Sequence, residues 1–233
     1  MILPKSLKYT DNSLYIIYSN ITIDELNTNK YYDDCHHEEA KIYTNDDKID
    51  AYPAFFIFHK SRCGSLLLTK MLTQKQDIVV ISEPHIINQC LSLNIEHKLK
   101  VKLLLTIITA FCNECNKYNK SVVFKFSSYC LQYIDMFNIF KTTKTIYITH
   151  DTLEVLKSNL INPTDEIRNN KIQLVSKFPD FNPTSHFLAY IFKMDELGSN
   201  CDYIINYNDI IKEDFIDTFN NIFIINHMKN ITI

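Results

Sequence analysis

Five short runs of apolar residues recur along most of this chain, separated by longer amphipathic stretches. A continuous apolar run without polar alternation is typical of a strand that is buried on both faces of a parallel sheet. The pattern therefore predicts a sheet of about five strands, formed by residues 54–59, 77–82, 121–126, 145–149 and 203–206.

The stretches between these runs carry apolar residues at helical spacing. They predict helices at 66–74, 96–119, 129–140, 152–160, 186–197 and 209–220, with a last short strand at 222–225. Strands that alternate with helices indicate a three-layer α/β fold whose mostly parallel sheet is covered on both faces. Ligands of such sheets bind beyond the carboxyl ends of the strands, so the loops there are the places to search for chemistry.

Residues 1–50 are polar and only weakly periodic, and residues 162–183 are rich in loop-forming residues. We expect residues 1–50 to form an N-terminal cover of irregular segments with at most a short helix, packed on a main domain of residues 51–233. The length of 233 residues fits one α/β domain and leaves little room for a second.

The formal net charge of -3 gives no indication of binding to nucleic acid or to an anionic membrane. The seven cysteines are odd in number and irregularly spaced, unlike a disulfide framework. Residues 1–18 contain no continuous apolar run, so we expect them to be neither a signal peptide nor a membrane anchor. We expect a reducing, cytoplasmic setting. The chain has only two arginines and two glycines, and one of each lies in the same short loop, at Arg62 and Gly64.

This loop, residues 60–65, joins the first predicted strand of the sheet to the next helix. A helix N-terminus after a glycine-containing turn attracts anions, because its N–H groups and the helix dipole point at the same place. Gly64 permits close approach of an anion to the backbone. Further donors are expected from Lys60, Ser61, Arg62 and Ser65. We also expect the Cys63 thiol, at a helix N-terminus beside Arg62, to have a lowered pKa.

The loop is not a Walker A motif, which requires two glycines and a Lys-Ser/Thr pair. Here Gly64 is followed by Ser65 and Leu66. The loop therefore disfavours ATP-dependent kinase chemistry.

The segments FHKSRCGSLLLTKML and VVISEPHIIN resemble the bacterial sulfotransferase-like P-loop family, whose hallmark is an SRCGST loop followed by a strand that ends in Ser-Glu-Pro. The segments VVFKFSSY, TIYITHDTLEVLKS and YIINYNDI are similar to later elements of the same family. The resemblance covers the chain from about Tyr52 onward. It implies a P-loop NTPase-like fold and transfer of a sulfuryl group from 3′-phosphoadenosine-5′-phosphosulfate (PAPS) to a small-molecule or peptide acceptor, without a metal.

The same resemblance implies roles for individual residues. Glu83 would be the general base for the acceptor, while the loop residues Lys60, Ser61, Arg62, Cys63, Gly64 and Ser65 would hold the phosphosulfate. Lys60 and Arg62 would also act in catalysis by stabilising charge on the transferring group and on the leaving phosphate. His150 stands where the family has an arginine for the 3′-phosphate, and Ser158 stands at the position of its serine partner. The chain departs from the family pattern at Thr152, which replaces a proline, and at Gly198, which stands alone instead of in a glycine-rich loop.

Other residues permit two interpretations each. Lys125 either extends into the crevice or lies at a strand edge, and His85 is either a second base or structural. Asp151 could imitate a Walker B carboxylate. Cys112 and Cys115 have the spacing of a zinc motif, and Cys35-His36-His37 offers residues of the same type. Packing inside a helix explains the first pair better.

Two other functions remain open from the sequence. One is a phosphotransferase that uses ATP and magnesium, and the other is a degenerate P-loop module that binds a partner without catalysis.

Overall fold

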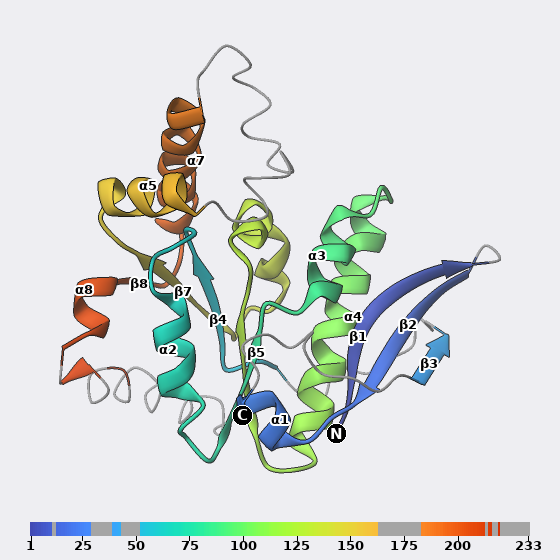
Figure 1. Cartoon of the computed structure of the whole chain (residues 1–233). Coiled ribbons are helices and arrows are strands. Elements are labelled where there is room, and N and C mark those ends of the chain that lie inside the picture. Colours follow the sequence, from blue (N-terminus) through green and yellow to red (C-terminus); the bar gives the residue numbers. More distant parts are fainter. Residues whose placement is uncertain are drawn as a thin grey trace.

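The computed structural model describes residues 1–10, 13–28, 39–42, 52–162, 183–212, 214, 215 and 219. Its centre is a five-stranded parallel sheet with the order β5-β6-β4-β7-β8 (Figure 1). The strands are β4 (Phe55–His59), β5 (Ile78–Ser82), β6 (Ser121–Lys125), β7 (Lys144–Thr149) and β8 (Tyr203–Asn206). The predicted parallel sheet is confirmed, and each strand begins within one residue of its predicted start.

The two faces of the sheet carry separate hydrophobic clusters, because successive side chains of a strand point to opposite sides. One cluster includes Phe55, Ile57 and Ile146, and packs against Leu68 and Leu72 of α2 (Ser65–Leu72). The larger cluster includes Phe56, Phe58 and Phe124 and lies under helices of the opposite face. Those helices are α3 (His85–Ser92), α4 (His97–Asn116) and α7 (Pro183–Gly198).

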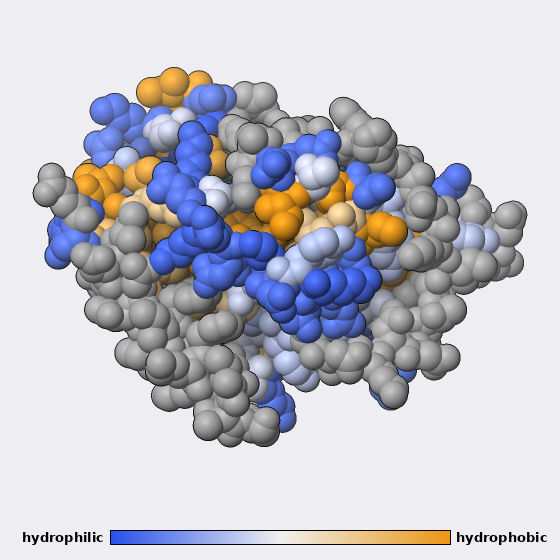
Figure 2. Space-filling model, turned by 90° about the horizontal axis from the view of Figure 1, so that it is seen from below, coloured by the Kyte–Doolittle hydropathy of each residue, from blue (hydrophilic) through white to orange (hydrophobic). Residues whose placement is uncertain are grey.

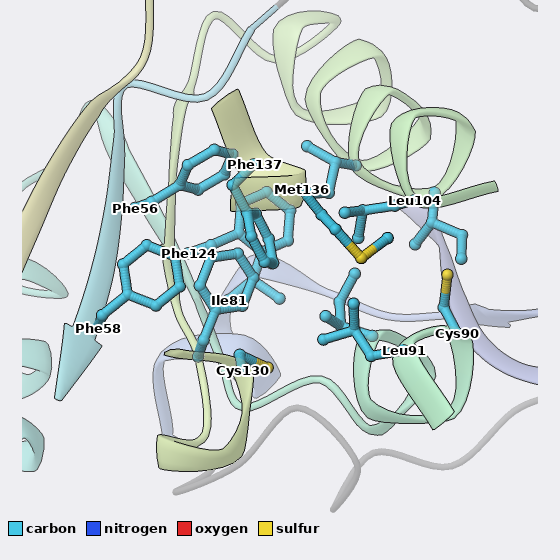
Figure 3. Packing of buried hydrophobic residues seen from close by; sticks show 14 of the residues in the cluster. Phe56, Phe58, Ile81, Cys90, Leu91, Leu104, Phe124, Cys130, Met136 and Phe137 are labelled. Atoms are coloured by element: carbon cyan, nitrogen blue, oxygen red, sulfur yellow. The ribbon is translucent and has the colours of Figure 1, made fainter. Parts of the chain in front are cut away.

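Figure 3 shows aromatic rings concentrated in the larger cluster. The ring of Phe56 lies between 5.2 and 6.5 Å from five other phenylalanine rings, in tilted and edge-to-face arrangements. Aromatic pairs of this geometry add to the stabilisation from burial alone. The chain has no tryptophan, and phenylalanines fill this part of the core.

The expectation of an irregular N-terminal cover is wrong for the residues that the structure describes. β1 (Ile2–Thr10) and β2 (Ser13–Asn20) form an antiparallel pair, and β3 (Glu39–Ile42) extends it to a three-stranded sheet. Among the described residues of this N-terminal region, only α1 (Ile23–Thr28) is helical. β1 packs on α3 and α4, so this small sheet covers the outer side of those helices (Figure 1).

Three further elements differ from prediction. Residues 129–140 form a 3-10 helix, η2 (Ser128–Ile139), which is interrupted at Tyr133; Leu131 and Phe137, on either side of the break, are both buried. The helix α3 was not predicted. The helix α8 (Tyr207–Ile210) begins two residues before the predicted 209–220. Half of the remaining residues of that prediction lie outside the described residues, and the strand predicted at 222–225 lies wholly outside them.

Seen from below, the described surface of the molecule is mainly hydrophilic, with apolar residues between the hydrophilic ones (Figure 2). None of the helices among the described residues combines the length and the apolar character needed to cross a bilayer.

Candidate functional site

The predicted anion-binding loop lies between the end of β4 and the start of α2, at the carboxyl edge of the sheet. Arg62 and Gly64 both adopt left-handed backbone conformations, with φ values of 58° and 77°, and Gly64 is the N-cap of α2. Left-handed residues in a turn gather successive N–H groups into a concave surface, and the first N–H groups of a helix lack partners within the helix. The loop therefore has a backbone geometry in which an anion can be bound.

Tyr207, the first residue of α8, lies directly against this loop. A methyl group added at Gly64 would lie 2.2 Å from Tyr207 Cδ2. The ring of Tyr207 is also 4.8 Å from the ring of His150, which follows the end of β7. His150 is thus connected to the loop through Tyr207, a residue that the sequence analysis did not single out.

Lys60, the first residue of the loop, is 1% exposed. Its Nζ is 2.8 Å from Oδ2 of Asp195 on α7. The same carboxylate accepts hydrogen bonds from the hydroxyl groups of Tyr147 (2.8 Å) and Thr149 (3.2 Å). Burial and the neighbouring charge of Asp195 raise the pKa of Tyr147, so its hydroxyl stays protonated and remains a donor. No sequence signal distinguishes Asp195 from other helical carboxylates.

The helix α5 (Thr152–Ile161) holds the loop from another side. Ser61 Oγ donates to Oδ1 of the fully buried Asn159 at 3.0 Å, and Asn159 Nδ2 donates to the carbonyl of Val155. The exposed Arg62 donates from Nη2 to the carbonyl of Asn162 at 2.7 Å. Ser158 precedes Asn159 on the same helix and is half-buried.

The expected low pKa of Cys63 is wrong. The thiol is fully buried, and this burial raises its pKa to about 12 against the opposing effects of the Ser65 N–H and the charges of Lys125 and Lys60. The free-energy cost of burying a thiolate away from water exceeds the stabilisation that the helix N-terminus gives to its charge. Cys63 is therefore a packing residue under the loop.

A second polar group lies where β4, β5 and β6 end. Oε1 of Glu83 accepts a hydrogen bond from Nζ of Lys125 and lies 3.6 Å from Nε2 of His59. Glu83 has a left-handed backbone (φ 49°), and its N–H donates to the carbonyl of Lys125. Lys125 is almost completely buried and pairs with Glu83. His59 belongs to the same group, although its position inside an apolar strand gives no indication of this in the sequence.

Burial alone would raise the pKa of Glu83. The nearby His59 imidazole and the charge of Lys125 outweigh burial and lower this pKa to about 2. The carboxylate is therefore ionised at every pH at which the folded protein would normally work.

Among the remaining candidates, Asp151, Cys112 and Cys115 have structural roles in the described part of the chain. Asp151 is the N-cap of α5 and accepts from the N–H groups of Leu153 and Glu154. Cys112 and Cys115 are buried in the packing of α4, which confirms the packing interpretation. His85 is exposed at the start of α3. Cys35, His36 and His37 lie outside the described residues.

The strand order and the loop between β4 and α2 together define a P-loop-like α/β protein. No protein-family model and no curated protein sequence matches the chain. Solved structures similar to it include a sulfotransferase from Alicyclobacillus acidocaldarius, with 14% identity and a TM-score of 0.39 over 70% of this chain and 76% of that one. They also include a shikimate kinase from Bacteroides thetaiotaomicron, with 11% identity and a TM-score of 0.39 over 70% of this chain and 91% of that one. Both likenesses are distant, and the fold class rests on the strand order and the loop.

Proposed function

We propose that this protein is a sulfotransferase that transfers a sulfuryl group from PAPS to a hydroxyl or amine of a small-molecule or peptide acceptor. The observation that carries the proposal is the ionised Glu83, which lies beside Lys125 and His59 at the strand ends that border the loop. A carboxylate next to an anion-binding turn can accept the acceptor's proton while the turn holds the donor. The loop also lacks the Lys-Ser/Thr pair that binds magnesium nucleotides.

In the proposed reaction, the acceptor oxygen or nitrogen attacks the sulfur of PAPS. A new bond from the acceptor to sulfur forms as the bond from sulfur to the bridging phosphate oxygen breaks. The acceptor's proton goes to Glu83, and the electron pair of the broken bond remains on the leaving phosphate. The N–H groups of residues 61–65 and the Arg62 guanidinium would stabilise that developing charge.

The Glu83–Lys125 ion pair predicts that the donor must bind before Glu83 can accept the acceptor's proton. While Lys125 is bonded to Glu83, the low pKa makes the carboxylate a weak base. A sulfonate or phosphate brought near Lys125 competes for its ammonium and weakens that pairing. The basicity of Glu83 should therefore rise when the donor is bound, at the moment when a base is needed.

His150 and Ser158 are part of the proposal as ligands of the donor's 3′-phosphate. In support, His150 lies against Tyr207, which contacts Gly64 of the loop, and Ser158 adjoins the residue that holds Ser61.

The six cysteines that the structure describes are free thiols, which agrees with the proposed reducing setting.

The test is thermal stabilisation by 3′-phosphoadenosine-5′-phosphate, the desulfated product, because a ligand that binds the folded state raises its melting temperature. We expect a rise in the wild type that is lost in Arg62→Ala. Lys70→Ala is the matched control, since it removes an exposed positive charge from α2 away from the loop. Glu83→Gln should keep the stabilisation and lose turnover of PAPS.

Absence of any rise with the bisphosphate would refute the sulfotransferase proposal. A response to ATP and magnesium alone would favour a phosphotransferase. No response to either ligand would favour a binding module without catalysis.

A further inference from the structure

The ion pair with Asp195 on α7 involves Lys60, the first residue of the anion-binding loop. Lys60 is almost completely buried, and its side chain runs from the start of the loop to α7. An ammonium group can donate three hydrogen bonds. Within the described part of the chain, Asp195 is the partner of this ammonium.

Asp195 is held in place by three donors: Lys60, which follows β4, and Tyr147 and Thr149, which both lie on β7. Tyr147 is itself fixed from behind, because a methyl group added at Gly198 would lie 2.4 Å from its ring. The carboxylate is therefore a fixed negative charge close to a loop that is built to bind anions. Such a charge repels an anionic ligand, and the repulsion grows with the charge of the ligand.

The charges around the loop are almost balanced. Lys60 is paired with Asp195, Lys125 is paired with Glu83, and Arg62 bonds to a neutral carbonyl. These five side chains leave one net positive charge. Removal of either carboxylate would double it, but only Asp195 has no part in the proposed chemistry.

We propose that Asp195 is a specificity-determining counter-charge of the loop: it limits the affinity for highly charged anions and so favours a ligand that presents a singly charged sulfonate or a lightly charged phosphate. This inference rests on the proposed anion-binding function of the loop. It assigns Asp195 a role in the choice of ligand by charge, whereas Lys60 supplies the positive charge that Asp195 offsets.

The experiment measures the dissociation constants of sulfate, pyrophosphate and tripolyphosphate at one ionic strength for the wild type and for Asp195→Asn. We expect the affinity gain in Asp195→Asn to increase with the charge of the probe, by roughly threefold for each added negative charge, the order that a partly screened unit charge gives. Tyr147→Phe is the matched control, because it removes a hydrogen bond to the same carboxylate without changing any charge. It should show no gain that depends on probe charge.

A second variant tests the same inference if Asp195→Asn does not fold. Lys60→Met combined with Asp195→Asn removes both members of the buried pair and leaves the net charge unchanged, an exchange that proteins often tolerate. Its relative affinities for the three probes should match those of the wild type.

An equal gain on all three probes, a loss on all three, or a charge-dependent gain in Tyr147→Phe would overturn the inference. The proposed function can fail separately. If the wild type binds none of the probes and no bisphosphate, the loop is not an anion site. If the wild type binds and Arg62→Ala does not, but Asp195→Asn shows no dependence on probe charge, only the role of Asp195 is refuted.

Discussion

Replacement of Gly64 by alanine tests the geometry of the loop most directly. The residue has a φ of 77°, and an L-residue with a β-carbon in the left-handed region costs about 1–2 kcal/mol. The new methyl group would also lie 2.2 and 2.4 Å from two carbons of the Tyr207 ring. Real β-carbons do not come this close to other atoms, so the ring must move away from the loop and from His150.

Displacement of a packed side chain by an extra methyl group costs about 1–3 kcal/mol. Together the two effects should lower the free energy of unfolding by about 2–5 kcal/mol. Urea denaturation followed by circular dichroism measures this loss. The chain has no tryptophan, so tyrosine fluorescence can serve as a second probe.

The double variant separates the two causes. In a Tyr207→Ala background the clash is absent, and Gly64→Ala should then cost only the backbone strain, about 1–2 kcal/mol. An equal cost in both backgrounds would refute the contact between Tyr207 and the loop. No cost in either background would refute the left-handed conformation of Gly64.

Three other expectations concern the side chains around the loop. The folded-state pKa of Glu83, about 2 against an ordinary 4.5, means that its stabilisation is present above about pH 4.5 and is lost as the pH falls toward 2. The stability difference between wild type and Glu83→Gln in acid titrations should therefore reach up to about 3 kcal/mol near neutrality and shrink in acid; a constant difference would contradict this. Cys63, with its pKa raised to about 12, should resist alkylation by iodoacetamide at pH 8 in the native protein and react after unfolding, as peptide mass spectrometry would report; rapid native labelling would show that the thiol is accessible. Asn159→Ala should lower the free energy of unfolding by about 1–3 kcal/mol, because it leaves the buried Ser61 hydroxyl without its acceptor, and the loss should be smaller in a Ser61→Ala background.

The parallel sheet could be predicted from the sequence because strands that are buried on both faces have a simple sequence pattern. The strands β4 and β5 are buried at every position, so each is a continuous apolar run in the sequence. The N-terminal sheet has a weaker sequence pattern. Its strand β1 mixes lysines and serine with leucines, and its pairing register with β2 shifts between Pro4 and Ser6. The available signal was the pair Asp11 and Asn12 between two short runs, residue types common in two-residue hairpin turns.

The site could be predicted only where the chemistry lies in consecutive residues. The loop follows β4 and Glu83 follows β5, and the parallel sheet places both at its carboxyl edge, with β6 between the two strands. Asp195 and Tyr207 reach the loop through tertiary packing alone, and nothing in their local sequence indicates it. The error on Cys63 has a related cause: a helix N-terminus is visible in the sequence, whereas complete burial of the thiol is not.

The attachment of β1 to the helices beside it has a consequence for how copies of this protein meet. β1 is an outer strand of the N-terminal sheet, and such strands readily pair with a strand from another molecule. Here the N–H groups of Ile2 and Leu7 donate to side-chain oxygens of Glu114 on α4 and Gln89 on α3. Two side chains thus occupy the places that a foreign strand would need. Glu114→Ala combined with Gln89→Ala would expose this edge, and self-association through added strands should then appear first at β1.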